Sequence, residues 1–149
     1  MKPIVLLFTV LYSAIGGCAT TQVSSQAQGV KGKVLWVEGN QMPGPDRKTN
    51  EGSPVTREIV FYDVLKTSDL KRLGALFQEP PFEPVAVVKT NEQGEFEINL
   101  PAGRYSLLTR ENNGLFANLF DGENNVNPVT VESGKFTDIK IVINYNAVY

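Results

Sequence analysis

The stretch TNEQGEFEINLPAGRY, residues 90 to 105, is the clearest indication of how this chain folds. In its middle, apolar residues at positions 96, 98 and 100 alternate with polar residues at positions 95, 97 and 99. Alternation with a period of two is typical of a β-strand that buries one face. Gly94 and Gly103 stand where turns would use the backbone freedom of glycine. The stretch therefore predicts a strand between two turns, with Phe96 and Tyr105 on adjacent strands and both facing the core.

The same alternation recurs along the rest of the chain. Near its end, Ile139, Ile141, Ile143 and Tyr145 share one face, and mostly polar residues separate them. Further segments rich in strand-forming Val, Ile, Phe and Tyr are residues 30–38, 57–64, 85–90, 104–110, 115–120 and 128–132. Consecutive hairpins across residues 85–110 would form an antiparallel meander. We therefore expect an all-β fold, an antiparallel β-sandwich of seven to eight strands.

Only residues 68–77 have a helical pattern. Leu70, Leu73 and Phe77 would share one face of a helix, and Ser68 or Thr67 could cap its first turn. We expect a short helix over about residues 68–77, in a crossover between two strands.

The motif within residues 90–105 resembles the core pattern of the carboxypeptidase regulatory-like domain, T-x-x-x-G-x-F-x-hydrophobic-x-hydrophobic-P-x-G-x-Y. The first strand-like segment, residues 29–34, is similar to the first strand of that family. The resemblance implies a transthyretin-like, prealbumin-like β-sandwich of about seven strands. The insertion at residues 65–83 departs from the family's compact pattern.

The N-terminus is typical of a secretory signal. Lys2 is followed by an apolar run and then by small residues, and the run is shorter than the roughly 20 residues that span a bilayer. Residues 15–18, Ile-Gly-Gly-Cys, resemble the bacterial lipobox, in which the cysteine thiol is acylated and the cysteine becomes the mature N-terminus. The resemblance implies a lipoprotein signal peptide over residues 1–17 and a lipid on Cys18. The alternatives are a buried segment and a coincidental cysteine near an ordinary cleavage site.

The polar, uncharged residues that follow Cys18 divide the anchor from the folded part. Residues 18–28 are predicted to be Cys18 and a flexible tether. Residues 29–149 are long enough for one β-sandwich domain. Residue 19 is Ala, not the Asp that favours retention in the inner membrane of well-studied lipoproteins. We therefore expect a bacterial cell-envelope protein, lipid-anchored on the periplasmic face of an outer membrane.

Composition argues against most catalytic classes. The chain has no histidine and one cysteine, so Ser-His-Asp and Cys-His catalysis and histidine zinc sites are excluded. Its net charge of −2 is unlike the basic footprint of a nucleic-acid-binding domain. We expect no enzyme activity, no cofactor and no nucleic-acid partner, with a carboxylate-dependent hydrolase as the catalytic alternative.

Two loops carry candidate binding residues. Asp121, Glu123, Asn124 and Asn125 offer oxygen atoms to a weak calcium site, although the alternative is a plain Asn/Gly-rich turn. The long segment 39–54 holds possible partner-binding residues, and these are Asn40, Gln41 and Met42.

These features together favour a lipid-anchored, non-catalytic module that binds an envelope protein or a glycan. The alternative from another class is a structural spacer of the envelope that has no specific ligand.

Overall fold

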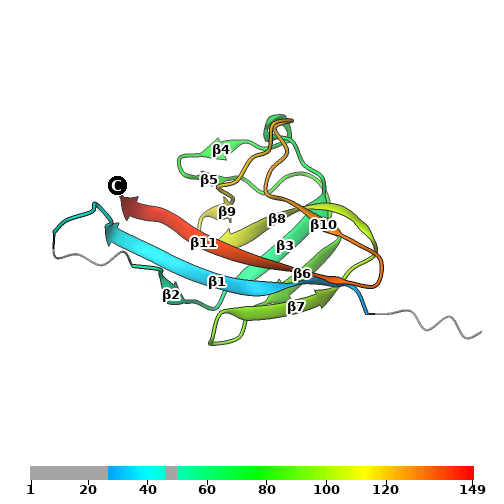
Figure 1. Cartoon of the computed structure of the whole chain (residues 1–149). Coiled ribbons are helices and arrows are strands. Elements are labelled where there is room, and N and C mark those ends of the chain that lie inside the picture. Colours follow the sequence, from blue (N-terminus) through cyan, green and yellow to red (C-terminus); the bar gives the residue numbers. More distant parts are fainter. Residues whose placement is uncertain (1–26, 46–49) are drawn as a thin grey trace, which may run out of the picture.

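Two packed β-sheets make up the computed structural model, which describes residues 27–45 and 50–149 (Figure 1). The described residues hold eleven strands and a single short 3-10 turn, so the predicted all-β, two-sheet fold is confirmed. The predicted signal peptide (1–17), Cys18 and most of the predicted tether lie outside the described residues. No helix within the described ranges is long and apolar enough to cross a membrane.

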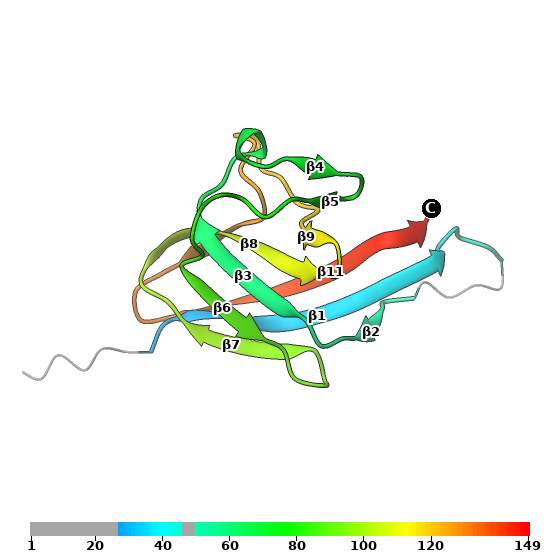
Figure 2. The same ribbon diagram turned by 180° about the vertical axis from the view of Figure 1, so that it is seen from behind.

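The first sheet is built around its longest pair of strands. Its members are β1 (Gly29–Asn40), β2 (Ser53–Pro54), β7 (Glu95–Asn99) and β11 (Phe136–Val148). β11 pairs with one edge of β1, while β7 and β2 pair with the other edge. β1 and β11 run side by side along the length of the domain (Figures 1 and 2).

The second sheet is centred on β8 and β3. Its members are β3 (Glu58–Asp63), β4 (Arg72–Leu73), β5 (Leu76–Phe77), β6 (Ala86–Lys89), β8 (Gly103–Glu111), β9 (Gly114–Phe116) and β10 (Pro128–Val131). β8 pairs with β3 on one edge and with β9 and β10 on the other, and all pairs in this sheet are antiparallel.

The pairing of β1 with β11 is the exception to the antiparallel pattern. These strands run parallel, from Gly29 beside Phe136 to Asn40 beside Val148, with a register shift between Trp36 and Glu38. Parallel neighbours need a long connection, and here nearly the whole domain supplies it. The alternation that predicted both strands contains no information about their relative direction.

An inner core fills the space between the two sheets. Phe96, on β7, and Tyr105, on β8, both belong to it, as predicted. Its other fully buried members come from both sheets, and they include Val30, Val34, Ile59, Phe61 and Ile143. The Tyr105 hydroxyl also donates a hydrogen bond to the carbonyl of Pro101 at 2.9 Å, so this tyrosine closes the turn that precedes its own strand.

The predicted meander across residues 85–110 is wrong. β6 pairs with β3, β7 pairs with β1, and β8 pairs with β3, so none of these three consecutive strands pairs with the next. The turns at 91–94 and 100–102 carry the chain from one sheet to the other. Gly94 has a φ of 73°, as expected, whereas Gly103 has no positive φ and lies in β8. Alternation is the same whether a strand's neighbour lies beside it or across the sandwich.

The predicted helix over residues 68–77 is also wrong. A 3-10 turn at Thr67–Asp69 is followed by the β4–β5 hairpin, and β5 pairs with β9. Gly74, with a φ of 64°, makes the hairpin turn, and glycine inside a helix would cost about 1 kcal/mol. The helix prediction placed Leu70, Leu73 and Phe77 on one face. Leu70 and Phe77 are buried, but Leu73 is 47% exposed. The segment is not a crossover either, because β3 and β6 on its two sides are paired neighbours.

The segment between β3 and β6 has a structural purpose of its own. This segment includes the edge strands β4 and β5, and it packs against the outer face of β3 and β8, where a second cluster of buried apolar side chains forms an outer core. The outer core consists of Val60, Tyr62, Leu65, Leu70, Phe77, Leu108, Leu115, Ala117 and Val126. The second sheet is therefore covered on both faces.

Candidate contact surface at the tip of the first sheet

The far ends of β1 and β11 meet at one end of the domain, which we call the tip: residues 40–42 with 148 and 149. The backbone N–H of Gln41 donates to the carbonyl of Val148 at 2.7 Å, and the N–H of Met42 donates to Asn40 Oδ1 at 2.8 Å. The first bond continues the β1–β11 pairing past the end of β1, and the second holds Met42 close to Asn40 within its own segment. The structure therefore joins the predicted contact residues Asn40, Gln41 and Met42 to the end of β11.

Exposed apolar side chains gather at the tip. Met42 is 51% exposed, Val148 is 58% exposed and Tyr149 is 69% exposed. The amide of Asn144 donates to the Tyr149 hydroxyl at 3.0 Å, which restrains the aromatic ring. Met42 was predicted as a contact residue because it lies in a long loop. Val148 and Tyr149 were not predicted, because they continue the strand pattern of residues 139–145 with no turn signal between.

A polar and aromatic cluster joins the two sheets next to the tip. Trp36 of β1 and Tyr145 of β11 stack edge to face, with ring centroids 5.2 Å apart. The guanidinium of Arg57 lies over the Trp36 ring at 5.4 Å, and the indole N–H donates to Glu38 at 2.9 Å. Trp36 packs against the inner core but is only partly buried.

Glu111, at the end of β8, is the charged centre of this cluster. Its side chain is 2% exposed, and both of its oxygen atoms accept from Arg57 Nε at 3.1 Å. The Tyr145 hydroxyl donates to the same carboxylate at 3.0 Å. Burial raises the pKa of Tyr145, and the hydrogen bond to Glu111 raises it further. A buried carboxylate is stabilised here by a cation and a hydroxyl group, as buried charges generally must be.

No sequence signal pointed to this cluster. Arg57 and Glu111 are 54 residues apart, and they meet because β3 and β8 pair with Glu58 opposite Arg110. That neighbouring pair forms its own ion pair at 2.8 Å, but its side chains are 40% and 42% exposed. Only the register of two distant strands brings these four charges into two adjacent pairs.

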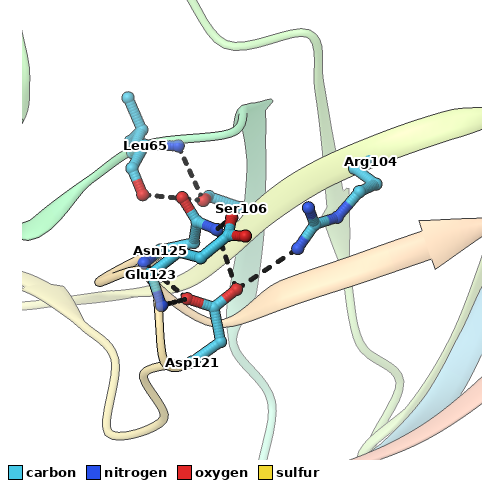
Figure 3. A network of polar contacts seen from close by, with 6 residues as sticks. All are labelled: Leu65, Arg104, Ser106, Asp121, Glu123 and Asn125. Atoms are coloured by element: carbon cyan, nitrogen blue, oxygen red, sulfur yellow. Dashed lines mark hydrogen bonds and ion pairs between the residues drawn. The ribbon is translucent and has the colours of Figure 1, made fainter.

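The predicted calcium loop follows β9 and is a tightly hydrogen-bonded turn (Figure 3). Asp121 Oδ1 accepts from the backbone N–H groups of Glu123 and Asn125, both at 2.9 Å. Asp121 Oδ2 accepts from the Asn125 side-chain amide at 2.8 Å and from Arg104 at 3.2 Å. β9 ends at Phe116, so the predicted strand over residues 115–120 is shorter than expected.

Both oxygen atoms of Asp121 thus have hydrogen-bond donors within the protein. The hydrogen bonds from Asn125 lower the pKa of the Asp121 carboxyl group below its usual value, with smaller contributions from Glu123 and Arg104. Asn124, the remaining member of the candidate site, has a positive φ of 63°. Among the described residues there is no group of three or more His, Cys, Asp or Glu side chains that could hold a metal ion. The calcium site stays a prediction.

Comparison of the sequence with known protein families finds no matching family, and comparison with curated proteins finds no match. The resemblance to carboxypeptidase regulatory-like domains therefore depends on the motif in residues 90–105 and on the first strand-like segment, residues 29–34.

Proposed function

We propose that this chain is a lipid-anchored, non-catalytic module of the bacterial cell envelope that contacts an envelope protein or glycan through the tip. The lipobox-like residues that end in Cys18 support the anchor. We place the anchor on the periplasmic face of an outer membrane, on the strength of Ala19. The observation that carries the contact role is the gathering of exposed apolar side chains at the tip, since such patches often mark interaction sites.

The direction of β1 supports this assignment. Gln28, just before β1, is fastened by its side chain, which donates to the carbonyl of Leu100 at 3.3 Å and accepts from the N–H of Gly134 at 3.0 Å. The 12 residues of β1 then run toward the tip, a distance of about 40 Å for an extended strand. A lipid on Cys18 would thus hold one end of the domain near the membrane and leave the tip at the opposite end.

We also propose that the domain is a carboxypeptidase regulatory-like, transthyretin-like sandwich. The support is the motif in residues 90–105, with the buried positions of Phe96 and Tyr105 and the positive φ of Gly94. The segment between β3 and β6 would then be an addition to that domain.

The anchor is tested by Cys18→Ala in the full chain. The variant should move from the membrane fraction to the soluble fraction after cell fractionation, while the parent chain stays with the membrane. A variant that remains in the membrane fraction would refute the lipid anchor.

The contact role is tested with a photo-crosslinking amino acid in place of Met42. The matched control carries the same amino acid in place of Glu97, which is exposed on the outer face of the first sheet. Irradiation of cells should give a discrete adduct from position 42 that position 97 does not give. Identical adduct patterns from both positions, or none from position 42, would contradict the role of the tip.

A further inference from the structure

β11 is a long strand with one unpaired edge. Over the described residues 27–45 and 50–149 it pairs with β1 alone, so its other edge has no backbone-paired strand, although the Thr137 hydroxyl donates to the carbonyl of Thr130 in β10. An unpaired edge presents a row of backbone N–H and C=O groups that another strand can bind.

The direction of these backbone groups follows from two contacts. The carbonyl of Val142 accepts from the Asn118 side chain at 3.1 Å, so it points away from β1. The carbonyl of Val148 accepts from Gln41 and so points toward β1, because the register shift between these two residues of β11 reverses the alternation. N–H and C=O groups of alternate residues point to the same edge of a strand. The backbone groups of Phe136, Asp138 and Lys140 therefore point outward with those of Val142.

An apolar groove runs along this edge, with a volume of about 380 Å³. β11 forms one wall through residues 139–142, and residues 118–121 and 127–129 form the other. Leu119 and Phe120, on the second wall, are 63% and 41% exposed. A strand added to β11 would cover both of these side chains.

The charges beside the edge form two rows on the outer face of the first sheet. In one row, Glu97, Lys31 and Asp138 are register neighbours, and their signs alternate. In the other row, Glu95 and Lys33 are followed by Lys140, so two positive charges stand side by side at the free edge. Like charges opposite each other on neighbouring strands are unfavourable. Within the first sheet, the row through Lys140 thus ends in a positive charge at the free edge, while the row beside it ends in a carboxylate.

We propose that the free edge of β11 binds the same edge of a second copy of this chain, antiparallel, about a two-fold axis at Ile139. In this register Asp138 of each copy lies opposite Lys140 of the other, and Phe136 lies opposite Val142. Each of these pairs joins outward-pointing backbone groups. The Asp138–Lys140 pairs can therefore exchange hydrogen bonds directly, whereas at the Phe136–Val142 pairs the incoming strand has to displace the Asn118 side chain from the Val142 carbonyl. The row formed by Glu95, Lys33 and Lys140 then continues into the carboxylate of Asp138 in the other copy. The first sheets of the two copies become one continuous sheet.

Charge selects this register over its neighbours. Moving the axis to Lys140 places the two copies of Lys140 opposite each other. Moving it to Asp138 does the same with two carboxylates. An axis at Ile141 leaves Lys140 opposite Val142 and forms no charge pair. Only the axis at Ile139 pairs opposite charges on both sides of the symmetry axis.

The test is the oligomeric state of the full chain, purified in a non-ionic detergent with micelles in large excess. Sedimentation over a range of protein concentrations should show a reversible dimer. Asp138→Lys places two pairs of lysines across the axis, and Lys140→Asp places two pairs of carboxylates there. Each should weaken dimerisation at least about tenfold, because attractive cross-strand pairs are replaced by repulsive ones. The double variant D138K/K140D restores opposite charges and should restore the dimer.

Glu97→Lys is the matched control. It changes the net charge as Asp138→Lys does, on the same face of the same sheet but away from the edge, and should leave dimerisation unchanged. A parent chain that is monomeric at all concentrations would overturn the proposal, and the charges on β11 would then protect the edge from pairing. Equal behaviour of the single and double variants would also overturn it, as would an effect of Glu97→Lys equal to that of Asp138→Lys.

Discussion

The two sheets differ in how many faces they bury. The first sheet faces the inner core on one side. Its other side presents charged residues where Lys31, Lys33, Glu95 and Glu97 lie, and only farther along β1 are Leu35 and Val37 buried outside the inner core. The second sheet is buried on both sides, by the inner core and by the outer core. Alternation of apolar and polar residues therefore indicates burial of one face of a strand, whereas a sheet buried on both faces is recognised by its unbroken apolar runs.

Those runs are present in the sequence. Residues 59–62, Ile-Val-Phe-Tyr, are all buried, and so are residues 105–109, Tyr-Ser-Leu-Leu-Thr. Ile59 and Phe61 contribute to the inner core, whereas Val60 and Tyr62 contribute to the outer core. Such runs imply a third layer over the second sheet, and the segment between β3 and β6 provides it.

The largest expected effect comes from a pair of neighbours on β8. Leu107 faces the inner core and Leu108 faces the outer core, and their exposed fractions are 2% and 0%. Leu107→Ala and Leu108→Ala should each lower the free energy of unfolding by about 2–5 kcal/mol, through lost burial and the remaining cavity. Urea denaturation checks both variants. A cost below about 1 kcal/mol for Leu108→Ala alone would show that the outer face of the second sheet is an ordinary surface.

The next effect concerns the link between the sheets. Glu111→Gln keeps the side-chain volume but removes the charge that binds Arg57, and it should cost about 1–3 kcal/mol. The control is Glu58→Gln. The Glu58 side chain pairs with Arg110 but is 42% exposed, so this substitution should lower the free energy of unfolding by less than about 1 kcal/mol. Urea denaturation of both variants measures the difference, and equal costs would contradict a special role for the buried pair.

The same substitution has a spectroscopic signature at Tyr145. Burial is the larger cause of its raised pKa, and Glu111 is the smaller one. Glu111→Gln should therefore lower the pKa of Tyr145 only part of the way, as measured by ultraviolet titration of the tyrosines. Because the folded state favours the neutral phenol, its contribution to stability is present below the unfolded pKa of about 10 and is lost as pH rises through the folded pKa. An unchanged titration would mean that Glu111 does not bind this hydroxyl in solution.

A smaller effect is expected in the loop that carries Val126 into the outer core. The pKa of Asp121 is lowered in the fold, chiefly by its hydrogen bonds from Asn125. Its contribution to stability is therefore present above the unfolded pKa of about 3.9 and is lost as pH falls through the folded pKa. Asp121→Asn should lower the melting temperature at pH 7, and the difference from the parent chain should vanish in strong acid. A difference that does not depend on pH would contradict this account.

The smallest effect is expected on the outer face of the first sheet. Glu97→Ala removes one exposed charge beside Lys31, and the free energy of unfolding should change by no more than about 0.5 kcal/mol. Chemical denaturation checks the value. A cost comparable to that of Leu108→Ala would remove the distinction between the two outer faces.

Much of the fold was predictable because strand formation is largely local. The strand from Glu95 to Asn99, the turn at Gly94 and the burial of Phe96 all follow from the residues themselves. The helix over residues 68–77 failed for a physical reason: an i, i+3, i+7 pattern of apolar residues also suits a hairpin that buries its ends. Gly74, inside the expected helix, was the local sign against it.

The candidate site was predictable only in part. Met42 was predicted as a contact residue because the segment 39–54 is long, and in the structure it is exposed at the tip with Val148 and Tyr149. The Arg57–Glu111 pair could not be predicted from the sequence, because the two residues are 54 positions apart and no local pattern links them. Cys18 remains a prediction from its own sequence context.

Local sequence patterns were enough to predict that the chain forms strands, where most of them begin and end, and which side chains of the first sheet face the core. The tertiary structure decided which strands pair, that β1 and β11 run parallel, that the second sheet is buried on both faces, and which edge stays free. The physical reason is that alternation and turn dihedrals are properties of a few consecutive residues. Pairing instead depends on which surfaces meet after the chain has closed loops of tens of residues.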